Sequence, residues 1–303
     1  MDKREILSKI KDQEQRYFAA HILNKLDSVC QYGTVEKTDF LDPAQQVFVL
    51  KLASQYGLNK MNCNFFGGFI EAERKVAVFC DLTTQPQYHQ ERINRFYQVH
   101  NNTGDYYQVH DNTDNFYQKT AEIVCVQSKL HINEKQKKQL TLSHRDYLGA
   151  LMGLGIERSK IGDIILDESG TKSHFFVCAE LKSFLTSNFI KVGNFGIELQ
   201  DIPLNEFDCG AKEQMSESRV TVSSLRLDCV LAAAMRLSRG KAADVIHAAK
   251  VSVNWEKCEN MARILKAGDV LSVKGFGRIY LIRVDGETKK GRVAIILGAL
   301  KKP

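Results

Sequence analysis

Hydrophobic and polar positions follow two different periods along the chain, and these periods predict its helices and strands. An amphipathic pattern at the N-terminus predicts a helix, and DPAQQVFVLKLASQYG predicts a second one. The segment CNFFGGFIEAERKVAVFC then predicts two strands around a turn at Gly67 and Gly68. Together these elements predict an N-terminal α/β domain over residues 1–81.

The next periodic region, residues 121–205, predicts elements in the order β-α-β-β-α-β. A strand (AEIVCVQSKL) precedes a helix (LSHRDYLGALMGLG) that Ser143 can cap, and a hairpin follows with its turn at residues 168–170. A second helix (LKSFLTSNFI) and a last strand (NFGIELQDI) complete the region. This order is typical of a split-βαβ sheet, as in RNA-recognition folds. We therefore predict an α+β protein with an RNA-recognition-like middle domain.

The last third of the chain predicts a small domain of two helices and short strands over residues 219–303, after a polar linker at 206–218. Leu227, Val230, Leu231 and Ala234 recur at helical spacing, which predicts the first helix. Ser238 stands at the N-cap of the second helix, RGKAADVIHAAK. VSVNWEK then predicts a short strand with a turn, and LKAGDVLSVKGFGRI ends in another strand.

An aromatic repeat occupies the region between the first two domains, residues 82–120. The triplets FYQ, YYQ and FYQ recur there every ten residues, together with His100 and His110. These side chains could stack on bases or bind a metal. However, the intervening residues are rich in Asn, Gln, Asp and Thr and offer no core to bury. We therefore favour a surface loop insertion.

Charge is distributed unevenly between the last third and the rest of the chain. From Arg219 to the end there are 17 basic and 7 acidic residues, a net charge of 17 − 7 = +10. The rest has 42 − 17 = 25 basic and 36 − 7 = 29 acidic residues, a net charge of −4. A concentrated positive domain attached to a nearly neutral body is typical of a protein that binds a phosphate backbone.

Composition excludes several other classes of protein. No run of about 18 apolar residues occurs, so we expect no membrane insertion. The eight cysteines are never closer than 17 residues apart, which excludes a local Cys-x-x-Cys site and suggests reduced thiols in a cytoplasmic protein. The histidines are scattered, so the sequence predicts neither a metal nor another cofactor.

One possible catalytic carboxylate needs separate consideration. Arg226-Leu227-Asp228 matches the Arg-Leu-Asp of pseudouridine synthases, in which a Gly precedes the Arg and the Asp is the nucleophile. Here Leu225 precedes the Arg, and too few residues follow for a catalytic body of that type. An Asp at a helix N-terminus is explained by the helix dipole and by pairing with Arg. We therefore expect a protein without enzymatic activity, in which Asp228 has a structural role.

Residues 219 to about 280 resemble the alpha-L RNA-binding motif, the small domain named after ribosomal small-subunit protein S-four. Its four blocks occur in order as Arg226-Leu227-Asp228, Ser238-Arg239, Val251-Ser252-Val253-Asn254 and Gly268-Asp269-Val270-Leu271-Ser272-Val273. The chain departs from the motif at two positions. Ala249 and Trp255 stand where many members have Gly, and Trp255 is either packed on the hairpin or a platform for a base.

The middle segment LSHRDYLGALMGLGIERSKIGDI resembles the bacterial YlmH family, and the resemblance extends over nearly the whole chain. It implies an N-terminal domain and an RNA-recognition-like domain before the alpha-L domain. It also implies association with the large ribosomal subunit during rescue of stalled nascent chains. The expected partners are therefore the ribosome, ribosomal RNA of the large subunit and tRNA in the peptidyl site, bound by a monomer.

We expect the RNA contacts to lie in the basic domain. The candidate residues are Arg226, Ser238, Arg239, Lys241, Lys250, Asn254, Lys257, Lys274 and Arg278. Arginine is the better bidentate ligand for phosphate, so Arg226 and Arg239 should contribute most. A second contact in the middle domain could involve His144, Arg145, Arg158 and Lys160, although capping and packing explain these residues equally well.

Two other functions are compatible with the sequence. The alpha-L motif could deliver RNA to a modifying enzyme, although residues 1–205 contain no recognisable catalytic group. Alternatively, the chain could be a scaffold in cell division or membrane assembly, in which RNA binding is secondary.

Overall fold

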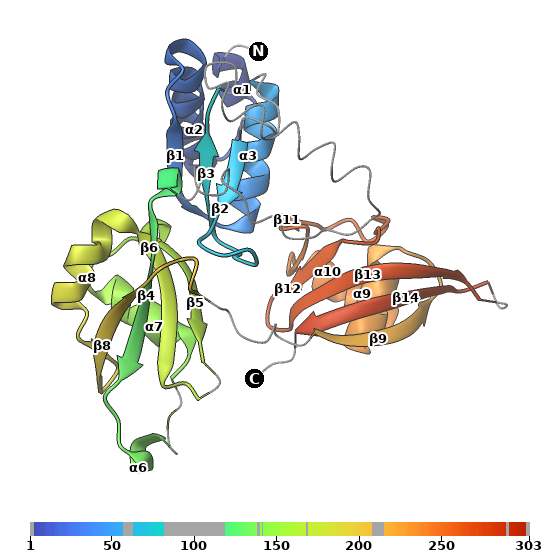
Figure 1. Ribbon diagram of the computed structural model, residues 1–303. Coiled ribbons are helices and arrows are strands. Elements are labelled where there is room, and N and C mark those ends of the chain that lie inside the picture. The colour runs from blue at the N-terminus through green and yellow to red at the C-terminus, as the bar shows by residue number, and fades with distance from the viewer. Residues whose placement is uncertain are drawn as a thin grey trace, which may run out of the picture. The chain divides into compact units, whose positions relative to one another are not determined.

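The chain divides into two units, residues 1–208 and residues 209–303 (Figure 1). A computed structural model describes residues 3–56, 63–81, 119–137, 140, 142–167, 169–207, 215–288 and 291–300. The aromatic repeat predicted within residues 82–120 lies almost wholly outside these residues, so its interpretation as a surface loop stays a prediction.

The N-terminal part of the first unit is a small antiparallel sheet covered by helices. Its elements are α1 Lys3–Ser8, α2 Gln13–Tyr32, β1 Glu36–Leu41, α3 Pro43–Gln55, β2 Cys63–Phe66 and β3 Lys75–Phe79, with strand order β1-β3-β2. Along β3, Ala77 and Phe79 pack into the core with the helices. The alternate residues Val76 and Val78 point to the other face of the sheet, where they join a separate core.

Two predictions for this region need correction. The single N-terminal helix is divided into α1 and α2, because Asp12 caps α2 by accepting a hydrogen bond from the Gln15 backbone N at 2.7 Å. Strand β1 was not predicted, because its sequence EKTDFL has a hydrophobic pattern only in its last residues. Thr38, Phe40 and Leu41 are nevertheless buried there.

The second part of the first unit has the predicted split-βαβ arrangement. Its strands are β4 Ile123–Leu130, β5 Ile161–Leu166, β6 Lys172–Cys178, β7 Lys191–Val192 and β8 Phe195–Ile202, and its helices are α6 Glu134–Lys137, α7 His144–Gly153 and α8 Lys182–Asn188. The antiparallel sheet has the order β5-β6-β4-β8-β7. Helices α7 and α8 contribute Tyr147, Leu151 and Leu185 to the core on one face of this sheet. This confirms the α+β fold class.

The C-terminal unit is a six-stranded antiparallel sheet with two helices against one face (Figure 1). Its elements are β9 Met215–Val222, α9 Leu227–Met235, α10 Arg239–His247, β10 Val251–Val253, β11 Glu256–Lys257, β12 Val270–Val273, β13 Gly277–Glu287 and β14 Val293–Leu300. Strand order is β11-β10-β12-β13-β14-β9. Leu227, Val230 and Leu231 of α9 pack on sheet residues such as Leu271 and Ile295, so both predicted helices and their core residues are confirmed.

The linker predicted over residues 206–218 is too long at its C-terminal end. Strand β9 already begins at Met215 and pairs with β14 along its whole length. Ser216, Glu217 and Ser218 are exposed, so this half of the strand is held by backbone pairing and carries no hydrophobic signal.

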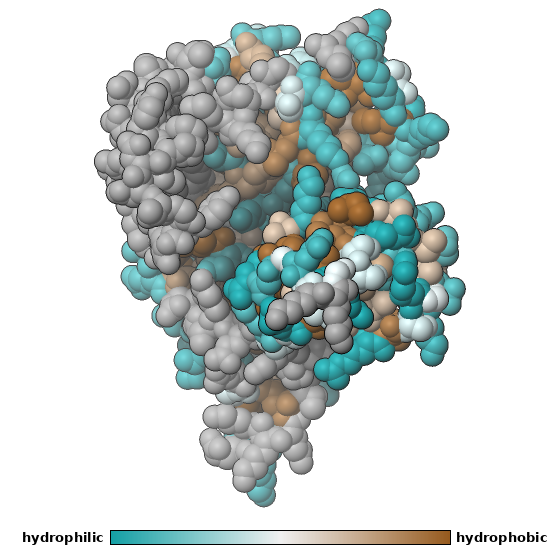
Figure 2. All heavy atoms as spheres, turned by 90° about the vertical axis from the view of Figure 1, so that its right-hand side faces the viewer, coloured by the Kyte–Doolittle hydropathy of each residue, from teal (hydrophilic) through white to brown (hydrophobic). Residues whose placement is uncertain are grey.

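Hydrophilic residues cover most of the described surface visible in Figure 2 and are interspersed with smaller apolar areas. No helix in the ranges described above is long and apolar enough to cross a membrane.

Candidate nucleic-acid interface

In the C-terminal unit, the side chain of Asp228 connects the starts of α9 and α10. Arg226 is the N-cap of α9, and its Nε donates to Asp228 Oδ1 at 3.1 Å. Arg239, the first residue of α10, donates from Nη2 to Asp228 Oδ2 at 2.7 Å. The backbone N of Cys229 donates to Oδ1 as well. One carboxylate therefore positions two guanidinium groups.

Hydrogen bonds and positive charge explain why this buried carboxylate stays ionised. The Asp228 side chain is only 7% exposed, whereas those of Arg226 and Arg239 are 38% and 59% exposed. Burial alone would raise the pKa of Asp228, but hydrogen bonds from Arg226, Arg239 and Cys229 hold that pKa well below its usual range. The carboxylate faces inward while the guanidinium groups face solvent. The predicted pairing of Asp228 with arginine is therefore confirmed.

Two further candidates lie at the start of α10. Ser238 Oγ accepts a hydrogen bond from the Lys241 backbone N at 3.3 Å, which confirms Ser238 as the helix N-cap. The Lys241 side chain is exposed and has no ion-pair partner within the described residues. These residues form one group around the helix starts. We call this group the Asp228 cluster; its members are Arg226, Asp228, Ser238, Arg239 and Lys241.

The other basic candidates lie in two different places in the C-terminal unit. Lys250 and Lys274 are adjacent, because the Lys274 backbone N donates to the Lys250 carbonyl oxygen at 2.9 Å. Lys257 and Arg278 lie on a row across the sheet, formed by the register pairs of Ser252 with Lys257, Ser252 with Ser272, and Ser272 with Arg278. The alternate strand residues face the core beneath α9 and α10, so this row lies on the opposite face of the sheet.

Asn254 has a structural role in the hairpin between β10 and β11. Its Nδ2 donates to Asp269 Oδ1 at 2.8 Å, and its Oδ1 accepts from the Val270 backbone N at 2.9 Å. Asn254 and Trp255 have φ angles of 50° and 65°, as in a two-residue type I′ turn. The indole Nε1 of Trp255 is buried and has no hydrogen-bond partner among the residues that the structure describes.

The segment beside Arg226 was not predicted from the sequence. Arg226 forms an isolated bridge with Ile264, and the Leu227 backbone N donates to the Arg263 carbonyl oxygen at 2.9 Å. Ile264 is exposed, so it and Arg263 border the Asp228 cluster. No periodic pattern or motif marks these loop residues, and only the tertiary fold brings them to this site. The described residues contain no group of three or more His, Cys, Asp or Glu side chains that could hold a metal ion.

In the first unit, the N-terminal sheet covers part of the middle sheet. Cys125 of β4 and Phe176 of β6 are register partners on the sheet face opposite α7 and α8. Both are buried in a core with Phe40, Val76 and Val78 of the N-terminal sheet. A Cβ atom at Gly162 would lie 2.6 Å from the Phe40 ring, so the two parts approach closely. The centre of the middle sheet is therefore inaccessible to RNA.

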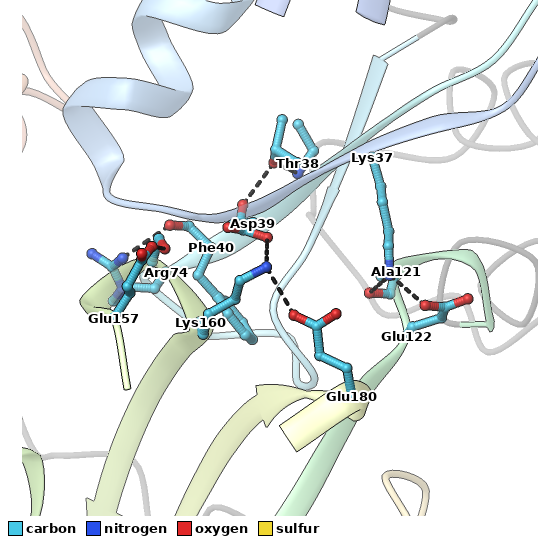
Figure 3. Close-up of polar contacts among 12 residues, drawn as sticks. Lys37, Thr38, Asp39, Phe40, Arg74, Ala121, Glu122, Glu157, Lys160 and Glu180 are labelled. Carbon is cyan, nitrogen blue, oxygen red and sulfur yellow. Dashed lines mark hydrogen bonds and ion pairs between the residues drawn. The ribbon is translucent and has the colours of Figure 1, made fainter. Parts of the chain in front are cut away.

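Polar contacts reinforce this contact between the two sheets (Figure 3). The Arg74 guanidinium donates to the carbonyl oxygens of Phe40 at 2.9 Å, Ile161 at 3.0 Å and Arg158 at 3.3 Å. Lys160 Nζ lies 2.8 Å from both Asp39 Oδ1 and Glu180 Oε1, and these hydrogen bonds raise the pKa of Lys160. Lys160 therefore has carboxylate partners from both parts.

The four residues predicted to form a second RNA contact in the middle domain fall into two groups with different surroundings. Arg158 donates from Nη1 to the carbonyl oxygens of Ile161 and Gly162, and burial lowers the pKa of Arg158 to about 10. Arg158 and Lys160 are thus engaged within the chain. His144 and Arg145 begin α7 and are exposed.

Comparison with known proteins agrees with this domain structure. Residues 127–206, from within β4 to just beyond β8, match the family described as "Putative RNA-binding domain in YlmH". Over 280 residues the chain is 29% identical to the Ribosome-associated protein quality control protein P2 of Bacillus subtilis (strain 168), covering 92% of this chain and 93% of that protein. The chain is therefore similar to the YlmH family.

A solved structure of the cell division protein ylmH from Streptococcus pneumoniae also resembles this chain. Its TM-score is 0.42 at 20% sequence identity, and the match covers 65% of this chain and 96% of that chain.

Proposed function

We propose that this protein binds structured RNA through the Asp228 cluster and works on the ribosome. The observation that carries the proposal is the arrangement of Arg226 and Arg239, which are held by one buried carboxylate and face solvent. Holding both guanidinium groups in place before RNA arrives lowers the entropy cost of binding phosphate. The net charge of +10 after residue 218 adds a general attraction for RNA.

Within this proposal each side chain has a distinct part. Arg239 donates from one nitrogen to Asp228, and its remaining N–H donors can contact a phosphate in a bidentate manner. Lys241 supplies a second positive charge on the same helix turn, and the Ser238 hydroxyl can donate to a sugar or phosphate oxygen. Lys250 and Lys274 extend the contact along a shallow groove of the RNA.

The finer proposal concerns the ribosome itself. We infer that the RNA is ribosomal RNA of the large subunit together with tRNA in the peptidyl site, during quality control of stalled nascent chains, which implies a cytoplasmic protein. The name of the Bacillus subtilis relative and the YlmH domain match support this role. His144 and Arg145 are the proposed second contact in the middle domain. On this view the protein acts by binding, and Asp228 takes no part in chemistry.

The test compares two arginines that differ in location but have similar local contacts. Arg239 is 59% exposed and 2.7 Å from Asp228, while Arg283 is 62% exposed and 2.8 Å from Asp285. We expect Arg239→Ala to weaken co-sedimentation with ribosomal particles by about 1–3 kcal/mol. The matched control Arg283→Ala should change it less than about twofold. Equal binding by wild type, Arg226→Ala and Arg239→Ala would contradict the proposed surface.

Salt dependence provides an independent measurement. If about four to seven phosphates are contacted, the logarithm of the affinity should fall with the logarithm of salt concentration at a slope of roughly −3 to −6. A flat response would show that charge does not drive the association.

A further inference from the structure

The turn between β12 and β13 presents an aromatic ring to solvent. Phe276 is 38% exposed, and its backbone N donates to the Val273 carbonyl oxygen at 3.0 Å, which closes the turn. Gly275 and Gly277 on either side have φ angles of 86° and 120°. A Cβ atom at either glycine would meet no atom within 4 Å, so the space beside both glycines is open.

Basic residues flank Phe276 along the chain. Lys274 precedes the turn and Arg278 follows it in the sequence. Lys250 lies next to Lys274, because the Lys274 backbone N donates to the Lys250 carbonyl oxygen. Both lysine side chains are exposed, and within the described ranges neither has an ion-pair partner. The ring therefore lies at a site that attracts phosphate.

We propose that Phe276 stacks on an unpaired nucleobase of the bound RNA, while Lys250 and Lys274 contact the neighbouring phosphates. This inference rests on the proposed function and adds to it a preference for single-stranded nucleotides. Every base has a π-face, so one exposed ring between cations can bind it without reading its sequence. A protein partner would instead require a contiguous apolar patch, whereas the neighbours of Phe276 in the turn are glycines and cations.

The experiment compares two RNAs and three substitutions in the full-length protein. One RNA is a hairpin with an unpaired loop, and the other is a fully paired duplex with the same number of nucleotides. We expect Phe276→Ala and Phe276→Leu to weaken binding to the hairpin about tenfold, since stacking on an aromatic ring contributes about 1–3 kcal/mol per base. Binding to the duplex should change less than about twofold. Phe276→Trp should retain binding to the hairpin.

Phe184 provides a matched control, because it is 41% exposed but belongs to α8 in the other unit. Phe184→Ala should leave binding to both RNAs unchanged. The Leu substitution keeps an apolar side chain in the turn and thereby separates stacking from general hydrophobic contact. Melting temperatures close to that of the wild type would show that all variants are folded.

The possible outcomes separate the two proposals. If the wild type binds neither RNA, the proposed function fails and the stacking inference fails with it. If the wild type binds the hairpin and Phe276→Ala binds it equally well, only the stacking inference is overturned. Equal losses on hairpin and duplex would also overturn it. The stacking inference would also be overturned if Phe276→Ala reduced only the co-sedimentation that survives ribonuclease treatment. In that case a protein, and not RNA, would cover the ring.

Discussion

Arg74 in the first unit and Arg239 in the second are chemically identical, but their surroundings give them different roles. Arg74 is partly buried and donates to three backbone carbonyl oxygens from two parts of the chain, and burial lowers its pKa. Arg239 is mostly exposed and donates one nitrogen to Asp228. A guanidinium group has five N–H donors, so the number already used decides what remains for a ligand. Arg74 holds the fold together, whereas Arg239 is available to bind.

The same contrast applies to the two sheets. The middle sheet has the strand order of an RNA-recognition fold, yet Phe176 at its centre is buried against the N-terminal sheet. The C-terminal sheet also has one face covered, by its own helices, and the Asp228 cluster lies at the starts of those helices. A fold associated with RNA binding therefore does not reveal which surface is free to bind.

The largest effect on stability should come from Arg74. We expect Arg74→Ala to reduce the free energy of unfolding by about 2–4 kcal/mol, because three carbonyl oxygens at the contact lose their donor. Denaturant unfolding would measure the loss. Arg16 also donates twice to a carbonyl oxygen, that of Ile10, but it is exposed, so Arg16→Ala should cost less than about 1 kcal/mol. Similar losses from both substitutions would remove the distinction based on burial.

Asp228 should affect both stability and binding. We expect Asp228→Asn to cost about 1–3 kcal/mol, because charged hydrogen bonds to Arg226 and Arg239 are weakened. RNA affinity should fall as well, since both guanidinium groups lose their anchor. Arg74→Ala should leave RNA affinity unchanged in protein that remains folded. Combined unfolding and RNA-binding titrations of the two variants would test this difference directly.

The effect of pH on this variant has a definite sign. Hydrogen bonds lower the pKa of Asp228 in the folded state below its unfolded value of about 3.9. The stabilisation is therefore complete above about pH 4 and is lost as pH falls through the folded pKa. The difference in unfolding free energy between wild type and Asp228→Asn should shrink as pH is lowered from 5 towards 2. A difference that stays constant would exclude the ionised carboxylate as its source.

RNA nucleoside composition should be unchanged in cells carrying Asp228→Asn, because we expect Asp228 to have a structural role.

Local patterns predicted much of the fold. The helix starts at Ser143 and Ser238, the order of the middle elements and the core positions of α9 all follow from short-range signals. Strand β1 escaped prediction because its sequence, EKTDFL, is apolar only in its last residues. The first half of β9 escaped prediction because backbone pairing holds it and its exposed residues carry no hydrophobic period. The contact between the first two sheets was not predicted either. The sequence of β3 is apolar on both faces, and this pattern is the same as that of a strand buried inside one domain.

The candidate site was harder to predict than the fold. The pairing of Asp228 with arginine followed from its position at a helix start. The division of the basic residues between two faces of the sheet did not, because it depends on the register of Lys257 and Arg278 across four strands. The borders of the site at Arg263 and Ile264 depend on a bridge between distant segments. Residue type indicates which side chains can bind phosphate, but tertiary structure decides which of them lie together.

The smallest effect is expected where the backbone of the C-terminal unit is strained next to a proposed RNA contact. Ala249 follows α10 with a φ of 52°, and its backbone N donates to the Ile246 carbonyl oxygen at 3.0 Å. The Lys250 backbone N donates to the Val245 carbonyl oxygen, so the helix ends in a Schellman motif that favours glycine at position 249.

We therefore expect Ala249→Gly to raise the free energy of unfolding by about 0.5–1 kcal/mol, because relief of the left-handed strain exceeds the entropy that glycine adds to the unfolded chain. The neighbouring Ala248 has a φ of −74°, so Ala248→Gly should instead destabilise the protein by up to about 1 kcal/mol. Denaturant midpoints at unchanged m-values would measure both shifts. RNA affinity should change less than about twofold, since the Lys250 side chain is untouched. If Ala249→Gly stabilised the protein but weakened RNA binding, the rigid backbone at this turn would itself contribute to binding, and the separation between residues that hold the fold and residues that bind RNA would fail here.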